Sequence, residues 1–334
     1  GGLNPAPVIV TGGLLPDGLF DGEMVSPRFG EQVACAGDVN NDGYDDVVVT
    51  APDQVTQGSI TVVNENGQVV QQPVTLHGQV LLYLGTAAGL SSTPAWTFEG
   101  FGQGDALKLV VSSAGDVNHD GYDDLLIGVP YADVSKIQDT GLVNLIDAGL
   151  AQLFLGSETG LFAEPAWTYR GQDQGGLFGW ALSTAGDVNG DDFADVVIGA
   201  YLEDSDAGTD EGHGYLFLGG ESGLESAPEA VFEGTEDGAW FGSSVAAAGD
   251  VNNDGFDDVV IGVPGLAGET GGVYLYLGSI DGLGENPLFI GAQTGQTWFG
   301  WEVAGAGDAN GDGFSDILVR ILVQGENGAE GRVF

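Results

Sequence analysis

Five short stretches of this 334-residue sequence carry acidic and amide side chains at a spacing that suits a hard metal ion. In the first stretch, residues 38–46, side-chain oxygens stand at positions 1, 3, 5 and 9, and glycine at position 6 permits a sharp turn. Ca²⁺ takes about six to eight oxygen ligands, which three side chains, the carbonyl of Tyr44 at position 7 and a bidentate Asp46 would supply. Mg²⁺ demands a tighter octahedron, and Zn²⁺ prefers His or Cys, which these loops do not concentrate.

The other four stretches repeat this donor pattern at the same offsets. The predicted calcium ligands of the five loops are Asp38, Asn40, Asp42, Tyr44, Asp46, Asp116, Asn118, Asp120, Tyr122, Asp124, Asp187, Asn189, Asp191, Phe193, Asp195, Asp250, Asn252, Asp254, Phe256, Asp258, Asp308, Asn310, Asp312, Phe314 and Asp316. A turn built from Asp and Asn would explain one loop without metal. Five copies favour about five structural calcium ions, because converging carboxylates repel one another without a cation.

Two details limit this interpretation of the loops. The third loop fits least well, because Asp192 replaces the turn glycine. An EF-hand begins in the same way but requires a glutamate at position 12, where the first loop has Val49. It is also flanked by helices rather than strands, so we reject it.

The acidic loops belong to a longer unit that recurs five times. A Phe-Gly pair, such as Phe241-Gly242, stands nine residues before the first aspartate in four units, whereas the second unit has Leu107-Lys108 there. Period-2 apolar runs predict four strands per unit: around Phe-Gly, after the acidic loop, before a Leu-Gly pair and after a proline. Four short antiparallel strands per unit are typical of a β-propeller blade.

The two ends of the chain are complementary in this pattern. The fifth unit stops inside its third strand at Phe334, while residues 1–13 carry an orphan fourth strand. We therefore predict an all-β fold, residues 1–334 forming one five-bladed propeller closed by the N-terminal strand, since closure leaves no exposed sheet edge. An excised piece of a longer array is the alternative. The predicted blades are residues 14–100, 101–171, 172–234, 235–292, and 293–334 together with 1–13.

Composition excludes several classes of partner. The chain has 50 acidic residues against 6 Lys and Arg, a net charge of -44, which repels nucleic acids and anionic lipid headgroups. No run approaches the roughly 18 apolar residues of a membrane span, so no membrane insertion is expected. The single cysteine, Cys35, is predicted to be a small buried hydrophobe. No nucleophile motif accompanies His77, His119 or His213, so we expect no catalytic residues and no enzymatic activity.

With Phe241-Gly242, the loop 250–258 and Gly262-Val263-Pro264, the chain resembles the FG-GAP repeat proteins, whose best-known members are the integrin α-subunit head propellers. The resemblance implies structural calcium in the acidic loops on one face and partner-binding loops on the opposite face. It also implies an extracellular setting, secreted or on the cell surface. That family head has seven blades against the five counted here, and other relatives include lectins and non-catalytic modules of secreted enzymes.

The candidates for recognition lie in inserted loops, residues 53–79, 131–149 and 201–213, the first with a hairpin turn at Asn66-Gly67. The residues that we predict to bind a ligand are Trp240, Trp298, Tyr131 and Tyr201. An exposed indole could stack on a sugar, but we expect both tryptophans to pack in the core or between blades instead. The acidic loop 201–213 could hold a further cation, but we expect it to be solvated.

The predicted function is an extracellular, calcium-stabilised binding or adhesion module whose partner is an extracellular protein or glycan. The alternatives are a lectin-like carbohydrate binder and a non-catalytic scaffold domain of a larger secreted enzyme or surface assembly. The first residues contain neither Met nor a signal sequence, which favours a processed or excised chain.

Overall fold

The computed structural model describes residues 28–63, 69–100, 108–138, 141–205, 208–293, 296–325 and 328–333. These residues form β-strands and connecting loops with one helical turn, α1 (Leu266–Glu269). Four sheets have four antiparallel strands each, and the last has three.

Sheets 1 to 5 follow one another along the chain. Sheet 1 contains β1 (Val33–Gly37), β2 (Asp46–Val63), β3 (Val69–Tyr83) and β4 (Trp96–Glu99). Sheet 2 contains β5 (Val110–Gly115), β6 (Asp124–Val129), β9 (Leu150–Phe154) and β10 (Trp167–Arg170). Sheet 3 contains β11 (Ala181–Gly186), β12 (Asp195–Ala200), β13 (His213–Phe217) and β14 (Ala230–Glu233). Sheet 4 contains β15 (Val245–Gly249), β16 (Asp258–Val263), β17 (Gly272–Tyr276) and β18 (Leu288–Gly291). Sheet 5 contains β19 (Gln296–Gly307), β20 (Asp316–Gly325) and β21 (Gly328–Val333), and β7 (Val134–Gln138) pairs with β8 (Gly141–Leu145) as a separate hairpin.

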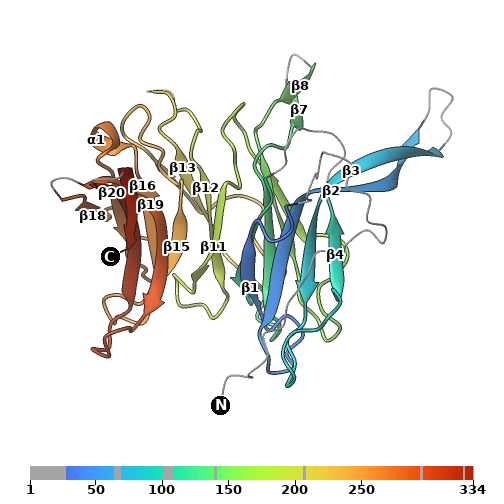
Figure 1. Cartoon of the computed structure of the whole chain (residues 1–334), viewed down its shortest axis with the longest axis horizontal. Helices are drawn as coiled ribbons and strands as arrows, with labels where there is room; N and C mark the ends of the chain where they lie inside the picture. Colours follow the sequence, from blue (N-terminus) through green and yellow to red (C-terminus); the bar gives the residue numbers. More distant parts are fainter. Residues whose placement is uncertain are drawn as a thin grey trace.

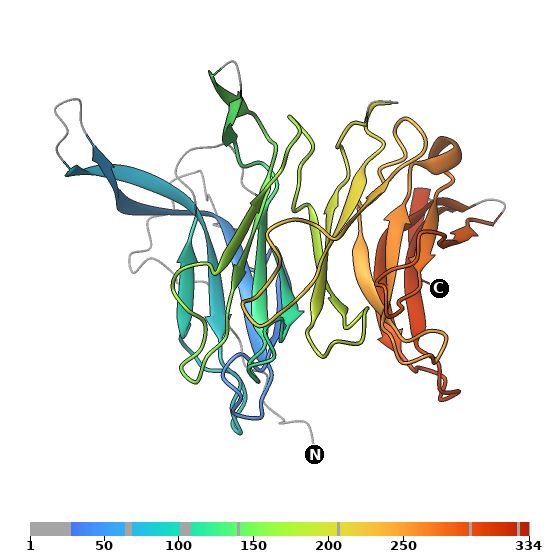
Figure 2. The ribbon, with the colours of Figure 1, turned by 180° about the vertical axis from the view of Figure 1, so that it is seen from behind.

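The sheets stand side by side along an arc, with sheet 1 toward one end and sheet 5 at the other (Figures 1 and 2). The first strands of successive sheets, β1, β5, β11, β15 and β19, contact one another and form the inner side of the arc. The second strands β6, β12 and β16 are buried at every residue, as their continuous apolar sequences require. The core therefore lies between the sheets.

The Phe-Gly pairs explain how closely the sheets approach. Phe178 and Phe241 are buried between neighbouring sheets. A Cβ added to Gly199 would collide with the carbonyl oxygen of Gly242. Gly242 itself has a φ of +78°, a conformation that glycine adopts without steric cost. Two glycines from adjacent repeats thus allow the backbones of sheets 3 and 4 to touch.

The structure confirms the all-β class and the four-stranded antiparallel sheets with sequential strand order. The predicted first strand is shifted, because Phe29-Gly30, Phe178-Gly179 and Phe241-Gly242 form turns before it and only the fifth pair lies within its strand, β19. Among the described residues no fourth strand joins β21. The predicted closing strand, residues 1–13, lies outside them, so ring closure, the blade number and the blade boundaries stay predictions.

Three local expectations can also be compared with the structure. The hairpin in residues 53–79 is confirmed as an extension of β2 and β3, whose pairing reaches Val63 opposite Val69, and Asn66-Gly67 lies outside the described residues. The loop 131–149 contains the unpredicted hairpin of β7 and β8. Cys35 is exposed rather than buried, because β1 is the inner strand of the first sheet of the arc and no other sheet among the described residues packs on its outer side.

The close approach of Gly199 and Gly242 predicts that Gly199→Ala destabilises the protein by about 1–3 kcal/mol, since the added methyl meets backbone that cannot turn aside. The matched control is Gly220→Ala, whose Cβ would have no neighbour nearer than 3.9 Å. Urea denaturation measures both free energies of unfolding. Equal effects of the two substitutions would contradict the role given to this contact.

Candidate metal loops and ligand pocket

Each acidic loop joins the first strand of its sheet to the second. Because neighbouring strands are antiparallel, these loops lie at one end of the molecule, here called the loop end, and the connections from second to third strands lie at the other, the pocket end. The outer part of β2 and β3, the hairpin β7–β8 and α1 all project at the pocket end (Figure 1). The structure therefore brings all five loops to the same end.

Hydrogen bonds within the first loop hold its oxygens in place. Asp38 accepts the N–H groups of Asp42 at 3.0 Å and Gly43 at 2.7 Å, one with each carboxylate oxygen. Asn40 Oδ1 also accepts the N–H of Asp42, at 3.2 Å, and Asp42 Oδ1 accepts the N–H of Tyr44, at 3.1 Å. The loop is thus an ordered set of Asx turns before any ligand is considered.

Position 9 is a carboxylate at the start of the second strand. In loop 1, Asp46 Oδ2 accepts the N–H of Val39 at 3.1 Å and Oδ1 accepts the N–H of Gly85 at 2.7 Å. Gly85 follows the third strand, so this carboxylate ties the loop to both neighbouring strands. The same pair of bonds recurs at the equivalent positions of loops 2, 3 and 4. The buried residues at position 9 are Asp46, Asp124, Asp195 and Asp258, each 0% exposed.

These carboxylates are costly to ionise. Burial raises the pKa of Asp46 to about 6 and the pKa values of Asp124 and Asp195 to about 7, and the amide hydrogen bonds oppose this rise. The aspartates at positions 1 and 5 of the same loop raise each pKa further by repulsion. A nearby divalent cation would remove this cost, since it favours the charged form.

The donor atoms of the loops are of the kind that calcium prefers. Oxygen donors from Asp, Asn and a backbone carbonyl suit a hard cation. In loop 2, Asn118 Oδ1 is buried with no hydrogen-bond partner, so the oxygen at position 3 is left for a ligand. Among the described residues no three His, Cys, Asp or Glu side chains form a group that could hold a metal. The predicted convergence of three carboxylates is therefore not seen in this structure, and the residues fit calcium by donor chemistry alone.

Neighbouring loops are linked to one another in series. The N–H at position 8 of each later loop donates to the carbonyl at position 1 of the loop before it, with distances of 3.1–3.3 Å. The pairs are Asp123 to Asp38, Ala194 to Asp116, Asp257 to Asp187 and Ser315 to Asp250. In addition, the carboxylate of Asp257 accepts the N–H of Asp187 at 2.9 Å. Ordering one loop therefore supports the next.

Loops 3 and 5 depart from the others in different ways. Asp192 has a φ of +71°, so it takes the left-handed conformation that glycine supplies at this position elsewhere. The third loop keeps its turn despite the substitution. In loop 5, Asp316 is only partly buried, and its Oδ1 accepts a 3.5 Å bond from Asn310 in place of the glycine N–H.

A cavity of about 730 Å³ lies at the pocket end, where the inner strands begin. We call it the axial pocket. The residue at the position directly after the Phe-Gly pair, or its equivalent, lines it in all five repeats: Glu31, Leu109, Trp180, Ser243 and Trp301. The volume is typical of small-molecule sites, which measure about 300–1,000 Å³.

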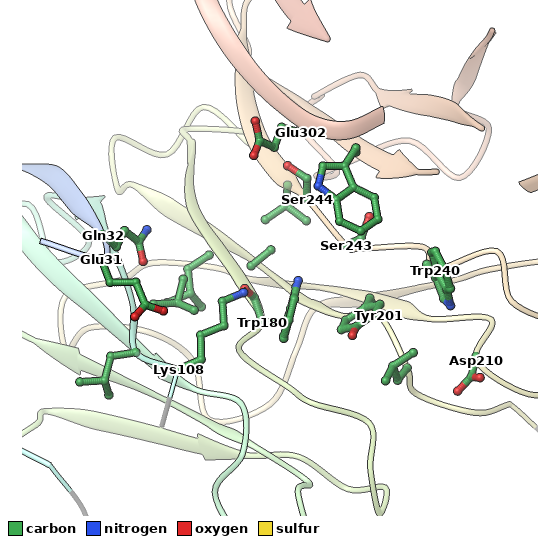
Figure 3. Close-up of a pocket in the computed structure, with 17 residues that line it drawn as sticks. Glu31, Gln32, Lys108, Trp180, Tyr201, Asp210, Trp240, Ser243, Ser244 and Glu302 are labelled. Carbon is green, nitrogen blue, oxygen red and sulfur yellow. The ribbon is translucent and has the colours of Figure 1, made fainter. Parts of the chain in front are cut away.

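Aromatic rings follow one another along this pocket. Figure 3 shows Trp180, Tyr201 and Trp240 in a row, and the ring centroids of Trp180 and Tyr201 are 4.6 Å apart. Trp240 stacks on Trp298 with centroids 5.1 Å apart and an interplanar angle of 18°. Tyr131 contacts Trp180 edge-on, at 6.4 Å. All four residues predicted to bind ligand therefore belong to one aromatic cluster. Tyr201 and Trp240 line the pocket, whereas Tyr131 and Trp298 pack against lining residues.

Sequence reasoning missed Lys108 and Trp180. Lys108 Nζ lies 3.1 Å from the centroid of the Trp180 ring, a cation–π contact, and 3.4 Å from the Trp180 carbonyl oxygen. Burial lowers the pKa of Lys108 to about 8, which Glu31 partly opposes. The signal was the departure of the second repeat, where Leu107-Lys108 replaces Phe-Gly.

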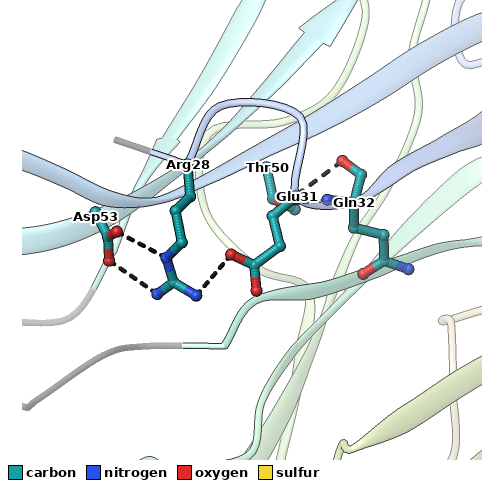
Figure 4. A network of polar contacts seen from close by, with 5 residues as sticks. All are labelled: Arg28, Glu31, Gln32, Thr50 and Asp53. Carbon is teal, nitrogen blue, oxygen red and sulfur yellow. Dashed lines mark hydrogen bonds and ion pairs between the residues drawn. The ribbon is translucent and has the colours of Figure 1, made fainter. Parts of the chain in front are cut away.

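Ion pairs fix the acidic rim of the pocket. Arg28 donates to Asp53 with two nitrogens, at 2.7 and 2.8 Å, and pairs with Glu31 at 2.7 Å (Figure 4). On the opposite side, Arg320 pairs with Glu302 at 2.8 Å. Both arginines lie beside the pocket rather than in its lining, so the rim keeps its carboxylates.

The acidic loop 201–213 is only partly exposed, in contrast to the prediction of a solvated loop. Glu203 and Glu211 are buried, at 7% and 4% exposed. Ser205 donates to the Glu211 carboxylate through its N–H, at 3.2 Å, and through its hydroxyl. Burial raises the pKa of Glu203. The hydrogen bonds of the loop's own backbone explain this burial, which acidic composition alone does not reveal.

Comparison with known families matches the FG-GAP repeat to residues 29–69, 110–143, 178–217 and 241–276. The fifth unit lies outside the matched residues. The chain is 29% identical to integrin alpha-5 of Xenopus laevis over 62% of the chain and 19% of that protein. It is 31% identical to integrin alpha-8 of Mus musculus over 64% of the chain and 19% of that protein.

A third relative is described as a phospholipase rather than an integrin. Phosphatidylinositol-glycan-specific phospholipase D of Bos taurus is 31% identical over 52% of the chain and 22% of that protein. The matched region thus covers about a fifth of each relative. No helix within the described ranges is long and apolar enough to cross a membrane.

The buried position of Lys108 predicts a pH dependence of stability. Its folded pKa lies below the unfolded value, so the unfolded chain binds more protons between about pH 8 and 10 and wild-type stability gains as pH rises through that window. Relative to Lys108→Met, the wild type should become more stable between pH 7 and 10, as measured by urea denaturation. Lys136→Met is the control for losing one positive charge. An equal pH effect in both variants would assign the change to net charge instead of the burial of Lys108.

Proposed function

We propose that this chain, in which four FG-GAP repeats are found, is an integrin alpha-like binding module, with calcium at its loop end and its ligand at the axial pocket. The observation that carries this proposal is the pocket itself. Five equivalent positions, one from each repeat, meet there and hold four types of residue: glutamate, leucine, serine and, twice, tryptophan. The repeat backbone is common to all five, so these side chains are available to select a partner.

Calcium has a structural role in this proposal. The loops lie at the opposite end of the inner strands from the pocket, so a bound ion would not contact the ligand. Asp and Asn at positions 1, 3, 5 and 9 and the carbonyl at position 7 would hold it. Millimolar calcium, as found outside cells, suits sites of modest affinity. We accordingly propose an extracellular setting, secreted or on the cell surface, and a partner that is an extracellular protein or glycan.

We propose no catalysis in this chain. A second candidate function, a non-catalytic domain of a larger secreted enzyme, is favoured by the similarity to the phospholipase D. The shared region spans 22% of that protein, which leaves room for its chemistry elsewhere. Binding of this chain to an extracellular protein or glycan supports the first candidate. Absence of any binding, with an intact parent chain that carries a separate catalytic domain, would support the second.

A direct test of the binding proposal uses the purified chain against immobilised extracellular-matrix proteins and glycans, in millimolar calcium and in EGTA. Specific binding in calcium that Trp240→Ala weakens supports a module that uses the pocket. Trp96→Phe is the control, because Trp96 lies on the outer strand β4 and donates its indole N–H to Phe162 O at 3.1 Å. Binding that is equal in both variants would place the partner elsewhere.

The proposed calcium sites predict that EGTA lowers the melting temperature. An ion at about 100 times its Kd stabilises the fold by about 2.7 kcal/mol per site, because it binds the folded chain only. Asp254→Asn should remove one site and about that much of the calcium effect, whereas Asp281→Asn, an exposed aspartate outside the loops, should leave it unchanged.

Calorimetric titration of the metal-free chain with calcium checks the number of sites in each variant. Melting that is unchanged between excess calcium and EGTA would contradict the structural role of the ion. A stoichiometry unchanged by Asp254→Asn would contradict the assignment of the fourth loop.

A further inference from the structure

We propose that the axial pocket binds one uncharged sugar residue, stacked on its indole rings and hydrogen-bonded to its polar rim. This inference rests on the proposed function as a binding module and names the class of ligand.

The pocket holds polar groups without partners. Ser243 Oγ is buried and makes no hydrogen bond, and a hydroxyl can rotate toward a ligand without losing one. The indoles of Trp180, Trp240 and Trp301 line the same cavity, and each carries one N–H donor. Trp167, which packs in the core, donates to Glu225 O at 2.8 Å. Buried polar groups normally find partners, so hydroxyls from a ligand fit here.

The aromatic rings provide flat apolar surface next to these polar groups. Trp301 is 42% exposed, and it contacts Trp240 and Trp298 edge-on at 6.4 and 5.5 Å. Trp240 and Trp180 are partly exposed in the same cavity. A pyranose ring has one apolar face of C–H groups and a rim of hydroxyls, and this combination matches an indole face beside hydrogen-bonding groups.

The charges of the pocket disfavour both ionic classes of ligand. Three carboxylates line it, Glu31, Asp210 and Glu302, but Lys108 lines it too, and Arg28 and Arg320 pair with Glu31 and Glu302. The positive and negative charges therefore nearly balance, and the pocket has no excess positive charge to attract a carboxylate or phosphate. A cation is disfavoured at Trp180, because Lys108 Nζ already occupies the ring face at 3.1 Å and repels a second positive charge. An uncharged ligand avoids both penalties, and carboxylates readily accept hydrogen bonds from sugar hydroxyls.

Cross-sheet hydrogen bonds hold the pocket wall in one arrangement. The Gln32 side chain spans sheets 1 and 2, with Nε2 donating to Val111 O at 3.0 Å and Oε1 accepting the Val111 N–H at 3.1 Å. Ser244 Oγ accepts the N–H of Val303 at 3.0 Å, between sheets 4 and 5. The ligand therefore meets a wall that is already ordered, which reduces the entropy cost of binding.

The test is calorimetric titration of the full chain in millimolar calcium with the methyl glycosides of galactose, glucose, mannose and N-acetylglucosamine. Methyl glucuronide and choline serve as the anionic and cationic comparators. We expect a neutral glycoside to bind best. Trp240→Ala should weaken it about tenfold or more, and Ser243→Ala, which removes one hydroxyl and disturbs the fold least, about three- to tenfold. Trp96→Phe should leave its affinity unchanged.

Each opposing result overturns a defined part of the proposal. Preference for methyl glucuronide with loss in Lys108→Met, or preference for choline, would overturn the neutral class. Sugar binding that neither Trp240→Ala nor Ser243→Ala weakens would place the sugar elsewhere. Absence of glycoside binding, with a protein partner whose binding Trp240→Ala reduces, would overturn the sugar and leave the binding module standing. No binding of any kind would overturn both, and the calcium titration remains an independent check that the chain is folded.

Discussion

One buried carboxylate in each of the first four repeats determines how the loop, the second strand and the third strand meet. Asp195, for example, accepts the N–H of Val188 at 3.0 Å with one carboxylate oxygen and that of Gly219 at 2.9 Å with the other. Its burial is unfavourable in the charged form, so the two amides and any cation nearby must offset that cost. At Asp316, which accepts a bond from the Asn310 side chain, the carboxylate is less buried and the repeat departs from the others.

The Phe-Gly pair holds neighbouring sheets together at the opposite end of the inner strands. Phe241 fills the space between two sheets, and Gly242 lets its carbonyl rest on Gly199 of the previous repeat. These two positions are constrained by packing, because a side chain on either glycine would separate the sheets. The next position points into the axial pocket and carries no such constraint. Residues as different as Glu31 and Trp301 occupy it without disturbing the repeat.

Much of this arrangement could be predicted from the sequence because it repeats. The offsets of the loop residues and the order of the strands recur in each copy, and such a repeated pattern seldom arises by chance. Features that occur once could not be predicted in this way. The burial of Glu203 depends on where a single inserted loop folds back, and the exposure of Cys35 depends on which sheet, if any, lies beyond β1. In the sequence, Lys108 is recognisable only as a departure from the repeat pattern. Its cation–π contact with Trp180 could not be predicted, because it depends on how two neighbouring sheets pack.

The loops and the pocket are joined by the same five strands. β11 runs from Ala181, in the pocket wall, to Gly186, directly before the first aspartate of loop 3, and β15 connects Val245 to loop 4 in the same way. Hydrogen bonds between consecutive loops fix the spacing of these strands at one end, and the glycine contacts fix it at the other. Under the proposed function, calcium would therefore affect ligand affinity through the spacing of rigid strands, without touching the ligand.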